Sequence, residues 1–168
     1  MEPEEGNSGS PFAQFCNERL QAYMCAEVIN IPTRMLVLGV EDEGRDAYYF
    51  ANRGFQVTGI DRVAEPRSVS FVKGNARFLK MSLEEFFKLP EAKQSYFHAV
   101  YCCILHKLCE DKRELVLQDS FYLLRPSGWL MLDLDPADIP TLNKAQFWRL
   151  RQVYQHRHDG FVRAIFRK

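Results

Sequence analysis

The sequence has 168 residues, which fits one domain with one core. Its 22 Lys and Arg residues balance 22 Asp and Glu residues, so no net charge attracts nucleic acid or an anionic membrane. Hydrophobic residues make up 46% of the chain, but no run reaches the ~18 apolar residues that span a bilayer. These bulk properties predict a soluble globular domain.

The first ten residues are polar and acidic and contain no apolar leader. We expect residues 1–10 to be a disordered tail and residues 11–168 to form a single domain. The five cysteines show no CxxC spacing, so we expect reduced thiols and a cytoplasmic location.

Alternating strand and helix patterns begin after the tail. Apolar residues at mixed helical spacing predict a helix over 11–29. A short apolar run over 35–38 predicts a buried strand, followed by a helix over 44–53 with Gly54 at its stop position. A second strand over 56–61 completes a βαβ unit.

The pattern becomes less clear in the next segment. A strand is expected at 69–72, and residues 79–81 belong either to it or to a turn. Ser82 and Glu85 have the spacing of a capping box, which predicts a helix start. An apolar run over 97–105 predicts another buried strand.

The last third of the chain predicts a helix, a turn and three strands. The helix covers 112–124, residues 125–128 form a sharp turn, and the next strand covers 129–135. Two strands then flank the Asp159-Gly160 pair, a strong hairpin signal. The whole order predicts an α/β fold: a doubly wound, mostly parallel sheet of seven strands that ends in an antiparallel hairpin.

The turn after the first strand, 39–46, is the place where a doubly wound sheet binds ligands. Gly39 and Gly44 have the spacing of a phosphate loop, but Arg45 and Asp46 replace its Lys and hydroxyl residues. Three consecutive acids, 41–43, would also repel a polyphosphate or a dinucleotide. S-adenosylmethionine carries a sulfonium and an ammonium instead, and its ribose suits a carboxylate such as Asp61.

Several segments in this order carry a family resemblance. Residues 35–61, Gly74-Asn75-Ala76, residues 97–108, residues 123–130 and the terminal hairpin together resemble class I S-adenosylmethionine-dependent methyltransferases. The likeness is nearest to the tellurite-resistance and thiopurine methyltransferase group and covers about residues 30–168. The chain departs from that group at Glu41-Asp42, where a glycine is usual, and it lacks an inserted cap.

The resemblance implies a Rossmann-like fold, S-adenosylmethionine as cofactor and a small-molecule methyl acceptor. No catalytic residue is assigned, which is compatible with a soft, thiol-like acceptor. Residues taken from the resemblance and from strand ends as cofactor-binding are Gly39, Val40, Gly44, Asp61, Arg62, Asn75, Ala76 and Cys102. The alternative is an inactive methyltransferase-like domain that binds a protein partner or serves a regulatory role.

The C-terminal segment from Lys144 to Lys168 carries seven basic residues and one acid. A solvated sheet edge explains this charge better than a nucleic-acid surface, so an RNA methyltransferase is the weakest hypothesis. His156 and His158 share one face of a predicted strand, but no third ligand accompanies them and no metal site is expected.

Overall fold

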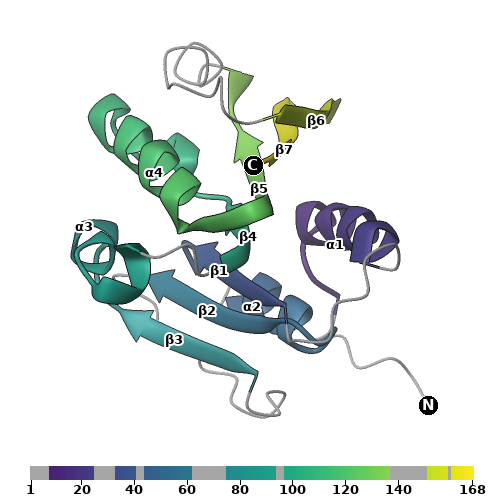
Figure 1. Cartoon of the computed structure of the whole chain (residues 1–168). Helices are drawn as coiled ribbons and strands as arrows, with labels where there is room; N and C mark the ends of the chain where they lie inside the picture. The colour runs from purple at the N-terminus through teal and green to yellow at the C-terminus, as the bar shows by residue number, and fades with distance from the viewer. Residues whose placement is uncertain are drawn as a thin grey trace.

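A computed structural model describes residues 8–24, 33–40, 44–61, 75–93, 97–136, 151–158 and 160–168. Its centre is a seven-stranded sheet with the order β3-β2-β1-β4-β5-β7-β6, in which β7 runs antiparallel to both its neighbours (Figure 1). The strands are β1 Arg34–Leu38, β2 Gln56–Asp61, β3 Ala76–Lys80, β4 Phe97–Cys102, β5 Leu124–Leu134, β6 Arg151–His158 and β7 Phe161–Arg167. The predicted fold class and the terminal hairpin are therefore confirmed.

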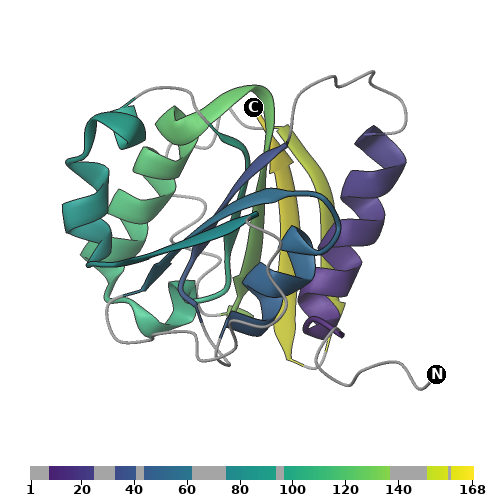
Figure 2. The ribbon, with the colours of Figure 1, turned by 90° about the horizontal axis from the view of Figure 1, so that it is seen from below.

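The described residues also form four α-helices and two 3-10 helices, and the α-helices cover both faces of the sheet. They are α1 Pro11–Met24, α2 Arg45–Ala51, α3 Leu83–Phe87, α4 Glu110–Leu123, η3 Pro90–Lys93 and η4 Leu105–Lys107. Figure 2 shows α1 and α2 on one side of the sheet and α3 and α4 on the other. None of the helices in the described ranges is long and apolar enough to cross a membrane.

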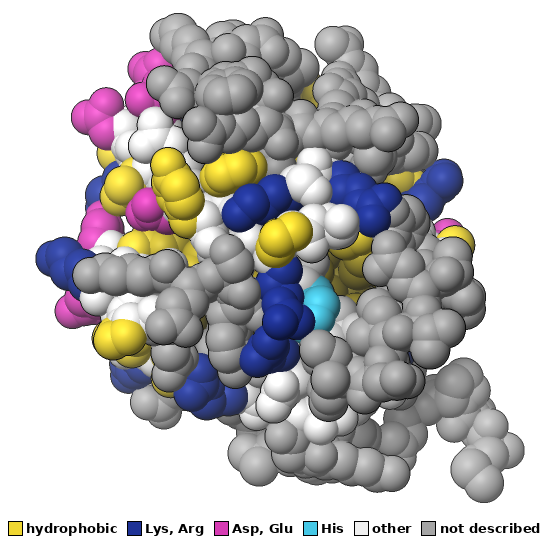
Figure 3. All heavy atoms as spheres, in the orientation of Figure 1, with side chains coloured by type: hydrophobic (Ala, Val, Ile, Leu, Met, Phe, Trp, Pro, Cys, Tyr) yellow, Lys and Arg dark blue, Asp and Glu magenta, His cyan; other side chains and the backbone are white. Residues whose placement is uncertain are grey.

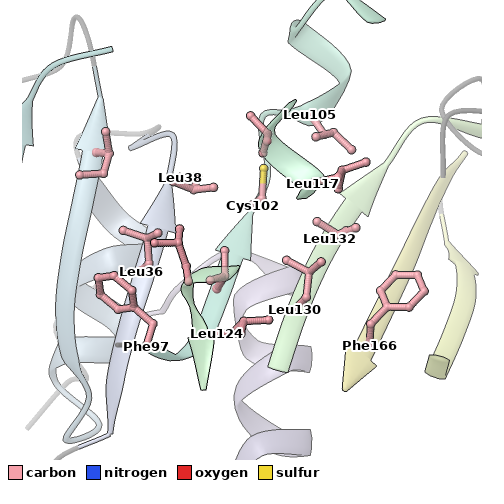
Figure 4. Packing of buried hydrophobic residues seen from close by; sticks show 14 of the residues in the cluster. Leu36, Leu38, Phe97, Cys102, Leu105, Leu117, Leu124, Leu130, Leu132 and Phe166 are labelled. Carbon is pink, nitrogen blue, oxygen red and sulfur yellow. The ribbon is translucent and has the colours of Figure 1, made fainter. Parts of the chain in front are cut away.

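The core has two layers because neighbouring side chains on a strand point to opposite faces. In β1, Leu36 and Leu38 join the cluster under α3 and α4, whereas Met35 and Val37 join the cluster under α1 and α2. Figure 4 shows the first cluster, where Leu36 and Leu38 lie opposite Leu130 and Leu132 of β5. Strands buried on both faces explain the continuous apolar runs seen in the sequence.

Local signals place several element ends where they were predicted. Gly44 precedes α2 with φ +85°, and Gly54 follows it with φ +92°, both in the region that favours glycine. Ser82 caps α3: its hydroxyl accepts the Glu85 N–H at 3.1 Å, while the Glu85 carboxylate accepts the Ser82 N–H at 2.7 Å. The predicted capping box is confirmed.

Two expectations need correction. Residues 125–128, predicted as a sharp turn between helix and strand, already belong to β5, which starts at Leu124 directly after α4. The ladder between β4 and β5 shifts register here, and Ser127 takes φ +65°, so the chain bends within the strand.

The second correction concerns the tail that we expected to be disordered over residues 1–10, because its last two residues, Gly9 and Ser10, are ordered. Gly9 is buried against the Tyr49 ring, and Ser10 is hydrogen-bonded to Asp46. Residues 1–7, the strand expected at 69–72, and the side chains of His156 and His158 lie outside the described part of the molecule.

Candidate functional site

The parallel strands β1 to β5 all end at one edge of the sheet, which we call the carboxyl edge; the opposite edge is the amino edge. A cavity of about 380 Å³ lies at the carboxyl edge, within the size range of small-ligand sites. Its lining residues are Gly39, Ile60, Asp61, Met81, Ser82, Leu83, Glu84, Ile104, Lys107, Leu108, Lys112, Leu115 and Val116. The cavity therefore joins the ends of β1, β2, β3 and β4 to helices α3 and α4.

Asp61 is the carboxylate at the end of β2, and it lines the cavity. Its Oδ2 accepts the Val40 N–H at 2.9 Å, while the neighbouring Gly39 N–H donates to the Ile60 carbonyl at 3.0 Å. These bonds hold the start of the loop after β1 against the end of β2. The carboxylate has two oxygens, so its acceptor capacity extends beyond the Val40 bond.

Gly39 is required by packing as well as by conformation. It takes φ +84°, and a Cβ at this position would lie 2.1 Å from Ile104 Cγ2. The Cys103 thiol also donates to the Gly39 carbonyl, with Sγ 3.7 Å from the oxygen. The loops after β1 and β4 therefore touch directly beside the cavity. The acidic residues 41–43, which the sequence sets beside this glycine, lie outside the described residues.

Asn75 and Ala76 lie far from the cavity along β3. Ala76 is paired with Val57 at the amino end of β2, and the Asn75 carbonyl accepts the Val57 N–H at 2.7 Å. The other end of β3 reaches the cavity instead, through Met81 and Ser82. The structure thus places Asn75 and Ala76 at the amino edge, because β3 begins at Ala76 rather than ending before it.

The other predicted site residues take different positions. Val40 contributes its backbone N–H, while its side chain is buried and packs near Gly59. Gly44 forms the start of α2 and is not among the residues that line the cavity. Cys102 is fully buried in the core, and burial raises the pKa of its thiol to about 12, so it is a packing residue. Arg62 lies outside the described residues.

Two cavity residues from helices could not be recognised in the sequence as a pair. Lys112 Nζ of α4 lies 3.1 Å from Glu84 Oε1 of α3, and both residues line the cavity. Backbone hydrogen bonding and then the Lys112 ammonium lower the pKa of Glu84, so this carboxyl is charged at neutral pH. Apolar side chains such as Leu108 and Val116 supply the remaining wall.

The Asp46 carboxylate of α2 forms a second polar group, which lies outside the cavity lining and attaches the start of α1 to α2. Asp46 Oδ2 accepts the Tyr101 hydroxyl and the Ser10 hydroxyl, both at 2.6 Å, and its Oδ1 accepts the Ser10 N–H at 2.6 Å. Burial, and then the Asp46 carboxylate, raise the pKa of Tyr101 well above its ordinary value, so its hydroxyl stays a donor. One carboxylate therefore joins α1, α2 and β4.

Comparison with known proteins supports the fold. No protein-family model matches the sequence, and no curated protein sequence matches it either. Solved structures do match the chain, and they show that its fold is that of class I S-adenosylmethionine-dependent methyltransferases. The strand order agrees with this fold.

Three of these structures illustrate the likeness. The 1,6-didemethyltoxoflavin-N1-methyltransferase of Burkholderia thailandensis superposes with a TM-score of 0.66 at 19% identity, over 94% of this chain and 78% of its own. A TehB-like S-adenosylmethionine-dependent methyltransferase of Corynebacterium glutamicum gives 0.62 at 17%, over 93% and 97%. The N-methyltransferase NodS of Bradyrhizobium japonicum gives 0.62 at 16%, over 99% and 92%.

Proposed function

We propose that this protein binds S-adenosylmethionine at the carboxyl edge and transfers its methyl group to a small-molecule acceptor. The observation that carries the proposal is the cavity of about 380 Å³ with Asp61 at the end of β2, in a sheet of methyltransferase order. The similar structures from Burkholderia thailandensis and Bradyrhizobium japonicum were solved with S-adenosylhomocysteine.

The residues present fit the adenosine half of this cofactor. Asp61 would accept hydrogen bonds from the ribose hydroxyls, each worth about 1.5–3 kcal/mol when one partner is charged. The apolar side chains of Met81, Ile104 and Leu108 would contact the adenine ring, with Ser82 as a polar neighbour. In this proposal Ser82 takes the place that the resemblance gave to Asn75.

The cofactor, when bound, supplies a methyl group activated by a sulfonium. The chain's own residues bind, orient and exclude water. Gly39 and Asp61 hold the start of the loop after β1 beside the cavity, and Asp46 holds α1 over the adjoining face of the sheet. Proximity and orientation of this kind contribute about 7–11 kcal/mol to lowering a barrier. An acceptor that is already a good nucleophile, such as a thiol, needs no base from the protein.

The four described cysteines are free, which supports a cytoplasmic location within this proposal.

Calorimetric titration with S-adenosylhomocysteine tests the proposal, because this product binds without turnover. We expect micromolar affinity, about −8 kcal/mol, and at least a tenfold loss in Asp61→Ala. Asp111→Ala is the matched control, since Asp111 is an exposed acid of α4 outside the cavity lining.

A second candidate is a methyltransferase-shaped binding module without activity. The polar groups of the cavity already have protein partners: Asp61 binds Val40, Ser82 binds Glu85, and Lys112 pairs with Glu84. Absence of heat and of thermal stabilisation at millimolar S-adenosylhomocysteine would reject the enzyme proposal and favour this candidate.

A further inference from the structure

A group of cations lies at the amino edge, at the opposite end of the parallel strands from the cavity. The strand register sets Arg34 of β1 beside His98 of β4, and Lys168 follows β7 with its N–H bonded to the Gly128 carbonyl at 3.0 Å. Arg125, at the start of β5, reaches back to His98. Figure 3 shows a histidine side chain with Lys and Arg side chains along one side of it.

The hydrogen bonds of His98 leave its outer nitrogen as a donor. Its Nδ1 lies 3.0 Å from the Arg34 backbone N–H, and a backbone N–H can only donate. Nδ1 must therefore be the acceptor, so in the neutral ring Nε2 carries the proton. This assignment follows from the chemistry of the partner and needs no observed hydrogen position.

The partner of Nε2 is also a donor. Arg125 Nη1 lies 3.1 Å from His98 Nε2, and a guanidinium has no acceptor. Two N–H groups thus converge at hydrogen-bond distance with no acceptor between them. An oxygen of a bound anion, placed beside both nitrogens, would accept from each and remove the conflict.

The charges around His98 and Arg125 also favour a bound anion. Burial, and then the charges of Arg125 and Arg34, lower the pKa of His98, and no carboxylate contributes to the shift. Asp119, the acid in the second half of α4, has its pKa raised by burial, with no cation acting to lower it. Lys168 Nζ lies on the same edge, where it donates to the Phe121 and Leu124 carbonyls at 2.9 Å each. Among the described side chains, no ion pair with a carboxylate offsets Arg125.

We propose that His98 Nε2 and the Arg125 guanidinium form a binding site for a phosphoryl group. Arg presents a planar fork that matches phosphate oxygens, and His98 adds a third direction of donation. The Arg34 charge, which also acts on His98, suits a dianion better than a carboxylate. The phosphoryl group belongs either to a small phosphorylated molecule or to a polynucleotide backbone.

The position of the site separates it from methyl transfer. Strands of five to six residues set the amino edge about 15–20 Å from the carboxyl edge, at ~3.3 Å per residue. A phosphoryl group at His98 therefore cannot touch a ligand in the cavity. This site would anchor a phosphorylated partner or ligand to the protein, independently of the proposed cofactor.

Nuclear magnetic resonance of the His98 ring tests the proposal without any cofactor. Inorganic phosphate is titrated into the full chain at pH 7.5, with sodium chloride adjusted to keep ionic strength constant. We expect a saturable shift of the His98 ring signals and a rise in the pKa of His98, because an adjacent dianion favours the imidazolium. Arg125→Gln should weaken phosphate binding at least tenfold, whereas Lys112→Gln, at the opposite edge, should leave it unchanged.

A ten-nucleotide oligouridylate distinguishes the source of the phosphoryl group. Tighter, salt-dependent binding of this RNA that phosphate displaces would indicate a polynucleotide backbone, and saturation by phosphate alone would indicate a small ligand. The proposal is overturned if His98 responds to neither probe, or if it responds equally in Arg125→Gln. Neither result depends on S-adenosylmethionine binding, so the two proposals fail separately.

Discussion

The two edges of the sheet differ in charge and in openness. The carboxyl edge carries two acids and two lysines around a cavity, namely Asp61, Glu84, Lys107 and Lys112, so its charges balance. The amino edge instead carries Arg34, His98 and Arg125 in close contact. Helix direction explains part of this contrast. Helices α2 and α4 run back between parallel strands, so their positive N-terminal ends lie at the carboxyl edge and their negative C-terminal ends at the amino edge.

The charges near α4 follow that dipole. Its first turn contains Glu110 and Asp111, and its last turn contains no base. Lys168, from the end of the sheet, supplies the missing cation by donating to the Phe121 and Leu124 carbonyls. The dipole therefore accounts for Lys168, but it gives no reason for two donors to converge at His98 and Arg125. Among the described residues of the amino edge, the contact between His98 and Arg125 is therefore what the proposed phosphoryl ligand explains.

Substitution of Gly39 should have the largest effect, because the carboxyl edge is tightly packed beside its cavity. In Gly39→Ala the new Cβ overlaps Ile104 and sits at positive φ. We expect a loss of about 2–5 kcal/mol of unfolding free energy in urea denaturation, combining overpacking with backbone strain.

Gly54→Ala is the matched control for Gly39→Ala. Gly54 also has positive φ, but nothing lies within 4 Å of its added Cβ, so we expect only about 1–2 kcal/mol. Adding Ile104→Ala to Gly39→Ala should relieve the overlap and leave the strain. Equal losses in the two alanine variants would show that the contact of the two loops is not what demands a glycine at 39.

Removing the Tyr101 hydroxyl tests the attachment of α1 near the carboxyl edge. Tyr101→Phe deletes a buried donor to Asp46, and we expect a loss of about 1–3 kcal/mol. Tyr122→Phe, on an exposed ring, should change stability by less than about 0.5 kcal/mol. Denaturant midpoints compare the pair, and identical midpoints would contradict a structural role for the Tyr101 bond.

Ser82→Ala should destabilise the protein by about 1 kcal/mol, because α3 loses its capping box. Circular dichroism during urea unfolding measures this change. If Ser82 also contacts the ligand, S-adenosylhomocysteine affinity should fall by a larger factor than stability alone explains. Ser82→Asp retains the cap, so it should restore stability, and failure to do so would place the effect elsewhere.

The smallest expected effect concerns pH at the amino edge. The pKa of His98 is lower in the folded protein than in the unfolded chain, so protonation favours unfolding. The stability that His98 contributes is present above about pH 6.5 and is lost as pH falls. Arg125→Gln removes one repelling charge and should flatten this loss. Urea midpoints at pH 7.5 and 5.5 measure it; a steeper loss in the variant would contradict the arrangement described.

The fold could be predicted well where strands are buried on both faces. Continuous apolar runs marked β1 and β4, the βαβ pattern marked β2, and the Asp159-Gly160 pair marked the hairpin. The limits of β3 could not be predicted because it is an edge strand in which no residue is fully buried, so its sequence lacks a continuous apolar run. Asn75 was expected at the site because Gly74-Asn75-Ala76 resembles a family motif, not because of the strand assignment.

The site itself was only partly predictable. Gly39 and Asp61 were found because strand ends in a doubly wound sheet meet at one place. Glu84 and Lys112 come from separate helices, and only the packing of α3 against α4 brings them to one cavity. His98 and Arg125 meet through a shift in strand register, which no spacing in the sequence encodes.

The carboxylate of Asp46 has a consequence for communication within the chain. It lies in the first turn of α2, which follows the loop that begins at Gly39, and it binds Ser10 directly before α1. A ligand whose binding stabilises the docking of α1 through Asp46 has its own affinity raised by that docking by the same factor. The rate of proteolytic cleavage near Ser10 would then fall when a ligand binds in the cavity, although the protease does not contact the cavity itself.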